Sequence, residues 1–228
     1  MGSYYQRKGA GRRTKLESKL MDDIDDIIQN EIPIVMFDKI NKLVNCSKVI
    51  IDDQQAAYNA VDHLIKKGYR RIAHFRGSLN PQNSIDRFLG YRKALTDNGI
   101  NFDPSIVYLC DNNDDFNDGY INAKKLLQEE NNVDAIFAIT DLVAVGILKY
   151  FNENNIKVPD EIAVFGFSDW FMSSVVTPSL SSVKQPSLNM GIKATEILIE
   201  EIEKKKNDTP VSFQNIVLPT ELIFRDST

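Results

Sequence analysis

The chain has 228 residues, a formal net charge of −5 and 43% hydrophobic residues. This length can bury one large core or two small ones. The acidic balance argues against a surface that binds duplex DNA, because phosphate contacts need clustered Lys and Arg. No apolar run approaches the roughly 18 residues that span a bilayer, and no secretory-type apolar stretch stands at the N-terminus, so we expect no membrane contact.

The two cysteines, Cys46 and Cys110, are far apart in the sequence. Their spacing suggests neither a disulfide framework nor a zinc site, and we therefore expect a reducing, cytoplasmic location. Residues 1–17 form a separate basic segment, since positions 4–15 carry five Lys or Arg and no acid. We interpret it as a disordered, solvated leader, with phosphate binding as the less favoured alternative.

From Ser18 onward, extended and helical patterns alternate. Strands are expected at 32–38, 48–52, 71–75, 106–109, 135–140, 161–167 and 181–185, and helices at 53–68, 84–99, 118–130, 141–155 and 187–206. Asp53 is the expected N-cap of the first helix, and 213–219 with 221–226 form an expected closing strand pair. Short connections between βα units give right-handed crossovers, so the pattern predicts an α/β fold with parallel sheets covered by helices on both faces.

Polar residues follow the ends of the expected strands. In an open parallel sheet, ligands bind at the carboxyl ends of the strands. The candidates there are Asp38, Asn83, Arg87, Asp114, Thr140, Asp141, Ser168, Asp169 and Trp170. Carboxylates, amides and a guanidinium can bind vicinal hydroxyls, and an indole can cover the apolar face of a sugar ring.

Each candidate also has a structural alternative. Asp114, Thr140 and Asp141 could simply cap the helices that follow them, and Trp170 could pack on a loop or on another subunit. For Asp38, capping and ligand binding are equally favoured. Arg87 lies in the first turn of its expected helix, where a cation opposes the helix dipole, and this favours a functional role.

Enzyme motifs are missing from the sequence. There is no GxGxxG after a strand, no GxxxxGK[ST], no HExxH and no GxSxG, and His63 and His74 lie inside a helix and a strand. The acidic loop at 111–115 lacks the glycine and final glutamate of a calcium loop. We therefore expect no catalysis, no cofactor and no metal.

Several blocks in order resemble the LacI/GalR family of transcriptional repressors. They include "VIIDDQQAAYNAVDHLIKKGYRRIAHFRG", "DRFLGYRKALTDNGI", "AIFAITDLVAVGILKYFNENNIKVPDEIAVFGFSDW", "TPSLSSVKQPSLNMGIKATEILI" and "LPTELIFRDST", within residues 32–228. The resemblance implies a two-lobed fold, similar to periplasmic sugar-binding proteins, that binds a small effector between its lobes and controls a DNA-binding headpiece.

The resemblance also suggests roles for individual residues. Arg87 stands at the family's ligand-binding arginine, Gln185 at a glutamine of the last crossover, and Asp38 at a polar strand end. Thr140 and Asp141 replace a frequent Asn-Asp pair, and Asn83 a small hydroxyl residue. Ser168 stands where many members have an aspartate, so that ligand contact by Asp169 instead is an open alternative.

The resemblance implies that the first lobe is incomplete in this sequence, because no helix-turn-helix headpiece, hinge helix or initial βαβα is recognisable before Ser18. We assign residues 18–51 and 185–212 to a remnant of the N-terminal lobe, and 52–184 and 213–228 to the C-terminal lobe. This chain alone should then read no operator DNA.

The expected function is effector sensing and homodimerisation in a cytoplasmic transcriptional regulator, with a carbohydrate as the expected effector. The alternative is a periplasmic or surface solute-binding protein that serves a transporter, because fold alone does not separate the two classes.

Overall fold

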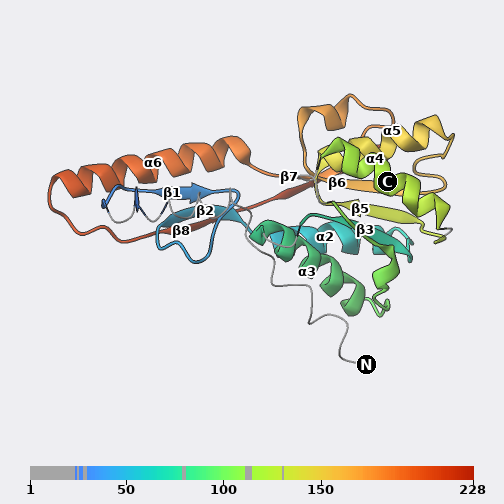
Figure 1. Ribbon diagram of the computed structural model, residues 1–228, viewed down its shortest axis with the longest axis horizontal. Coiled ribbons are helices and arrows are strands. Elements are labelled where there is room, and N and C mark those ends of the chain that lie inside the picture. The colour runs from blue at the N-terminus through green and yellow to red at the C-terminus, as the bar shows by residue number, and fades with distance from the viewer. Residues whose placement is uncertain (1–23, 25, 28–29, 79–80, 111–114, 130) are drawn as a thin grey trace.

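The computed structural model describes residues 24, 26–27, 30–78, 81–110, 115–129 and 131–228. Within these residues the strands form two separate sheets, one of six strands and one of three. We call the six-stranded sheet with its four helices the larger lobe, and the three-stranded sheet with its single long helix the smaller lobe. Figure 1 shows the two lobes side by side along the longest axis of the molecule.

The larger lobe has the strand order β4-β3-β5-β6-β7-β9. Its strands are β3 (Ile72–Arg76), β4 (Val107–Leu109), β5 (Ala135–Ala138), β6 (Ala163–Ser168), β7 (Ser181–Lys184) and β9 (Glu221–Ile223). All neighbours run parallel except β9, which pairs antiparallel with β7. Helices α2 (Asp53–Lys66) and α3 (Gln82–Asp97) cover one face, and α4 (Phe116–Gln128) and α5 (Asp141–Glu153) cover the other (Figure 1).

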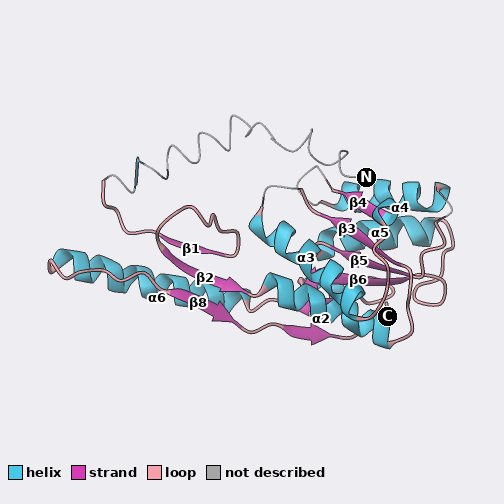
Figure 2. Ribbon diagram, turned by 90° about the horizontal axis from the view of Figure 1, so that it is seen from below, coloured by secondary structure: helices cyan, strands magenta, loops and turns pink. Residues whose placement is uncertain are grey.

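The smaller lobe contains β1 (Val35–Phe37), β2 (Ser47–Ile51) and β8 (Asn215–Leu218), all parallel and in the order β1-β2-β8. Helix α6 (Ser187–Lys206) packs on β1 and β2. Figure 2 shows α6 running beside this sheet and away from the larger lobe. The chain passes between the lobes after Ile51, after Lys184 and after Leu218.

Two sequence-based expectations about the C-terminal strands are wrong. β8 pairs with β2 of the smaller lobe, and β9 pairs with β7 of the larger lobe, so the two do not form a closing strand pair. The expected boundary that placed 213–228 in the larger lobe therefore moves beyond Leu218. An apolar run specifies a strand but not its partner, which is chosen by non-local pairing.

The periodic segments form the elements for the expected reasons. In α2, the apolar residues at helical spacing are buried, and Gly68 follows the helix at a φ of +107°. Strand β6 is buried along its length because helices cover both faces. The N-cap of α2 is Asp52, which accepts the Gln55 amide at 2.8 Å, and not the expected Asp53. Within the described part of the chain, no helix combines the length and apolarity that a bilayer crossing requires.

Candidate functional site

A cavity of about 280 Å³ lies where the two lobes meet. Its walls come from the carboxyl ends of β1 and β2 in the smaller lobe and from the first turns of α2 and α3 in the larger lobe. The lining residues are Asp38, Ile40, Lys42, Ile50, Ile51, Asp52, Asp53, Gln54, Gln82, Asn83, Asp86 and Val217. This is the position at which parallel α/β sheets place their ligands.

Polar contacts connect the two sides of this cavity, which we call the interlobe cavity. The Gln185 side-chain amide donates to Oδ1 of Asp38 at 3.3 Å, and Lys42 lies 3.8 Å from the carboxylate of Asp86 on α3. Asp38 has a φ of +60°, a left-handed conformation that is costly without glycine. Strained residues of this kind often occur at ligand sites.

The first turn of α3 contributes amide and hydroxyl groups beside the cavity. Oδ1 of Asn83 accepts the Ser84 amide at 2.9 Å, which leaves the Asn83 side-chain NH₂ for other partners. The Ser84 hydroxyl is buried and has no hydrogen-bond partner among the described residues. Asp38 and Asn83 are thus the two predicted site residues that line the interlobe cavity.

Arg87 is buried and is not among the residues that line the cavity. Its Nε donates to Oδ1 of Asp53 at 2.7 Å, its Nη1 donates to the Ile139 carbonyl at 2.7 Å, and its guanidinium lies 3.5 Å from the centre of the Phe167 ring. Because α3 begins at Gln82, Arg87 lies in the second turn and not in the first, so the dipole argument for its function does not apply.

The ion pair between Arg87 and Asp53 interacts with two other carboxylates of the cavity wall. Burial raises the pKa of Asp53, the Arg87 guanidinium opposes this rise, and the carboxylates of Asp38 and Asp86 add to it. The three carboxylates therefore interact with one another although they come from different elements. A direct ligand contact by Arg87 stays a prediction.

Asp141 holds the carboxyl ends of β5 and β6 together. Its carboxylate accepts the Trp170 amide at 2.7 Å and the hydroxyls of Ser173 at 2.7 Å and Ser182 at 2.5 Å. A Cβ on Gly166 would lie 2.2 Å from Oδ1 of Asp141, so the glycine makes room for this network. Thr140 caps α5 by accepting the Val143 amide at 3.3 Å, which agrees with the helix-cap alternative.

Ser168 ends β6 and Asp169 follows it, and both have positive φ values, +125° and +52°. Asp169 pairs with Arg225 at 2.7 Å, and Arg225 also donates to the Leu180 carbonyl at 2.6 Å. Trp170 is 45% exposed, and its ring contacts the Phe171 ring in a T-shaped arrangement. None of these residues lines the interlobe cavity, and their role as ligand contacts stays a prediction. Asp114 lies outside the described residues.

Sequence reasoning missed most of the cavity wall. Asp52 and Asp53 directly follow β2, so the strand-end rule that found Asp38 after β1 would have found them if it had also been applied to β2. Lys42, Gln54, Gln82 and Asp86 carry no comparable signal, because only the folded arrangement brings them to the cavity.

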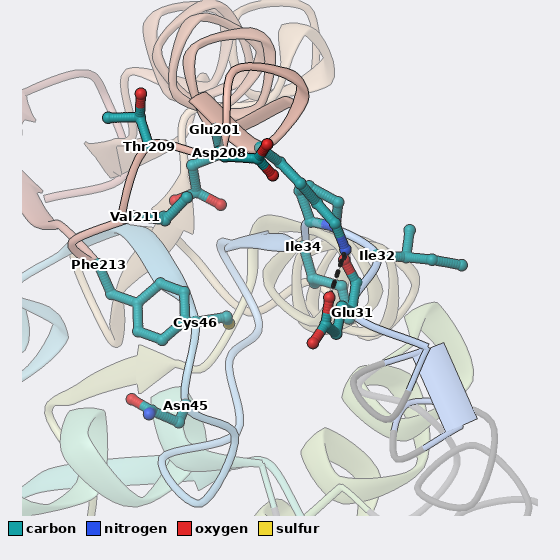
Figure 3. Close-up of a pocket in the computed structure, with 12 residues that line it drawn as sticks. Glu31, Ile32, Ile34, Asn45, Cys46, Glu201, Asp208, Thr209, Val211 and Phe213 are labelled. Atoms are coloured by element: carbon teal, nitrogen blue, oxygen red, sulfur yellow. Dashed lines mark hydrogen bonds and ion pairs between the residues drawn. The ribbon is translucent and has the colours of Figure 1, made fainter. Parts of the chain in front are cut away.

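A second, larger cavity of about 430 Å³ lies at the opposite end of the smaller lobe (Figure 3). Its walls are the segments before β1, β2 and β8 together with the C-terminal part of α6. Glu201 is buried there and accepts a hydrogen bond from the Ser47 hydroxyl. We call it the distal cavity, because it opens at the amino ends of the strands, away from the larger lobe.

Neither cavity provides a metal site within the described residues, where no group of three or more His, Cys, Asp or Glu side chains is arranged to hold an ion. The polar groups around the interlobe cavity are instead suited to accept and donate hydrogen bonds to a small polar molecule.

Known proteins with similar sequences and folds share this architecture. Residues 61–228 match the model of a family described as periplasmic binding protein-like domain. The chain is 30% identical to catabolite control protein A of Priestia megaterium and 32% identical to the HTH-type transcriptional regulator RegA of Clostridium saccharobutylicum, over 91% and 93% of its length. It spans 61% and 63% of those proteins.

A solved structure shows the same fold with a sugar. The chain is similar to the transcriptional regulator CelR in complex with cellobiose, with a TM-score of 0.81 and 28% identity. The likeness covers 89% of this chain and 61% of that one.

Proposed function

Because the chain belongs to the family of periplasmic binding protein-like domains and its relatives are LacI-family transcriptional regulators, we propose that it is the effector-sensing part of such a regulator, with a carbohydrate as its effector. The relatives reported above are regulators, which favours this function over that of a transport-associated solute-binding protein.

The interlobe cavity is the observation that carries the proposal. A ligand held there contacts Asp38 and Lys42 from the smaller lobe and Asn83 and Asp86 from the larger lobe. Such a ligand binds best when both walls are in place, and its binding energy therefore biases the relative position of the lobes. This is the property that an effector domain needs in order to control an attached domain.

The chemistry of the cavity suits polyhydroxylated molecules. Carboxylate oxygens accept hydrogen bonds from hydroxyls, and the Asn83 amide and the Lys42 ammonium donate to them. The cellobiose complex of the similar regulator supports a sugar as the ligand class.

The proposal extends to assembly and DNA. We assign DNA contact to a headpiece attached to this domain, which places the protein in the cytoplasm. We assign self-association to the short helix η2 (Phe171–Ser174) and its neighbours, where Phe171 and Val175 are 65% and 63% exposed. Contiguous exposed apolar side chains of this kind commonly mark subunit contacts.

A thermal-shift panel of pentoses, hexoses, disaccharides, hexuronates and purines tests the proposed function. A ligand at about one hundred times its Kd adds about 2.7 kcal/mol to stability, and this raises the Tm of a chain of this size by about 5 to 10 °C. We expect at least one carbohydrate to produce such a rise. A rise with purines alone would contradict the sugar assignment, and no rise with any compound would contradict effector sensing.

A further inference from the structure

The interlobe cavity is lined by four carboxylates from both lobes. Asp38 follows β1, Asp52 and Asp53 stand at the start of α2, and Asp86 lies on α3. The carboxylates of Asp38 and Asp86 each add to the rise in the pKa of Asp53 that burial causes, which agrees with their shared position around the cavity. A polar lining alone would accept any sugar, but this lining also carries negative charge.

The nearby cations do not balance these charges. Arg87 is buried outside the cavity, and its guanidinium is held by Asp53, the Ile139 carbonyl and the Phe167 ring. Lys42 has a side chain that is 61% exposed, and its 3.8 Å separation from Asp86 is a loose contact. Four carboxylates against these two cations leave the cavity with an excess of negative charge.

The remaining acceptor capacity of the carboxylates lies mainly on Asp38 and Asp86. Asp52 caps α2 and Asp53 is occupied by Arg87. Among the described residues, Asp38 accepts one hydrogen bond, the 3.3 Å contact from Gln185, and Asp86 accepts the Gln82 side chain at 2.7 Å besides its contact with Lys42. A carboxylate has sites for about four hydrogen bonds, so both retain free lone pairs.

A charge on a bound ligand would interact strongly with the carboxylates of the cavity walls. The cavity is bordered by protein from both lobes, so charges inside it interact through a lower effective dielectric than in bulk water. A carboxylate or phosphate on the ligand would be repelled by the walls, and a protonated amine would be attracted from both lobes.

We propose that the effector carries a protonated amine, as an amino sugar does, and that Asp38 and Asp86 receive this amine from the two sides of the interlobe cavity. This inference rests on the proposed function, because it specifies the chemical class of the effector at the same site.

Matched sugars test the charge preference directly. Glucosamine, galactosamine and mannosamine are compared with glucose, galactose, mannose, glucuronate and galacturonate at equal concentration, pH 7 and low ionic strength, with Tm as the measured quantity. We expect an amino sugar to raise the Tm more than its neutral parent does, uronates to have no effect, and the difference to shrink in 0.5 M NaCl because salt screens the attraction.

The outcomes separate the inference from the function on which it rests. A neutral sugar or a uronate that stabilises the protein as much as the matching amine overturns the amine proposal and leaves sugar sensing in place. Absence of any shift across this panel overturns the amine proposal, whereas sugar sensing is contradicted only if the pentoses and disaccharides of the first panel also leave the Tm unchanged.

Variants that neutralise a single carboxylate test whether Asp86 and Asp38 bind the amine. We expect Asp86→Asn to weaken binding of the stabilising amino sugar about fivefold more than it weakens binding of the neutral parent, because the neutral sugar loses only a hydrogen-bond acceptor whereas the amine also loses the opposite charge. Asp38→Asn should behave in the same way and serves as the second variant if Asp86→Asn does not fold. Asp160→Asn, at an exposed position in the larger lobe, is the matched control and should change neither affinity. Equal losses for the amine and the neutral sugar would overturn the assignment of the amine to these carboxylates.

Discussion

The buried ion pair between Arg87 and Asp53 joins the second turn of α3 to the start of α2. Both side chains are almost fully buried, so removal of one leaves the other charge without its partner. Breaking such a pair costs far more than the pair contributes relative to apolar residues of similar volume. The residue that most resembles a family ligand contact is therefore also a structural residue.

We expect Arg87→Met to lower the free energy of unfolding by about 3–5 kcal/mol, and the double variant Arg87→Met/Asp53→Ala to recover a large part of that loss. Urea unfolding followed by circular dichroism measures both. Lys149→Ala, which removes one side of the exposed Lys149–Glu153 pair, is the control and should cost less than about 1 kcal/mol. A loss of that small size for Arg87→Met would show that the pair is not buried as described.

His74 makes stability depend on pH. Its ring is fully buried against Tyr91 and Phe137, and burial, with smaller effects of the Arg76 and Arg87 charges, lowers its pKa to about 3. The unfolded chain binds a proton at His74 near pH 6.5, whereas the folded chain binds it only near pH 3. The contribution of the neutral His74 ring to stability is therefore fully present above pH 6.5 and is lost as the pH falls from 6.5 toward 3.

Replacement of His74 by Gln removes this contribution. Between pH 6.5 and 5, the free energy of unfolding of the parent should fall by up to about 1.4 kcal/mol per pH unit more steeply than that of His74→Gln. His63→Gln is the comparison, because burial also lowers the pKa of the less buried His63 and the change in slope should be smaller. Parallel pH profiles for parent and His74→Gln would refute the buried, neutral state of this ring.

At the scale of elements, close contacts between helices depend on glycine. A Cβ on Gly90 of α3 would lie 2.2 Å from the Gln54 carbonyl and 2.9 Å from the Ala57 Cβ on α2, whereas a Cβ on Gly191 of α6 would meet nothing within 4 Å. The same substitution should therefore have opposite effects at the two positions.

We expect Gly90→Ala to destabilise the protein by about 1–3 kcal/mol through overpacking of α2 against α3. Gly191→Ala should stabilise it by up to about 1 kcal/mol, since alanine has the higher helix propensity. Thermal and urea unfolding of the two variants give the comparison. Equal changes in stability at both sites would mean that α2 and α3 are farther apart at Gly90 than the structure shows.

The long helices and the central strands could be predicted from the sequence because each one has a clear period. The helix expected at 187–206 is α6, and the strands expected near 72, 135 and 163 are β3, β5 and β6. The sheet of β8 could not be predicted, because its pairing with β2 joins segments more than 150 residues apart. The cavity wall was missed for the same reason, since Lys42 and Asp86 meet only after the lobes are in place.

At the scale of the whole molecule, the exposed apolar side chains near η2 predict self-association. Trp170, Phe171 and Val175 are all exposed and lie within or next to η2. We expect a homodimer whose dissociation constant rises at least tenfold in Phe171→Glu, because a charge would be buried in the contact. Sedimentation velocity over a concentration series measures this.

Ile121→Glu, at another exposed apolar position on α4, is the control and should leave association unchanged. A parent that remains monomeric at every concentration up to several hundred micromolar would contradict the predicted contact, as would equal weakening by both variants.

The central claim is that the effector binds between the lobes, and isothermal titration of the best sugar from the thermal-shift panel into two wall variants tests it most directly. Asn83→Leu changes the interlobe cavity, and Asn45→Leu changes the distal cavity. We predict that Asn83→Leu weakens binding by at least about fivefold, since the loss of a hydrogen-bonding group from a ligand site costs about 1–3 kcal/mol, whereas Asn45→Leu binds like the parent. Loss of binding in Asn45→Leu with parental affinity in Asn83→Leu would place the effector in the distal cavity and contradict the account.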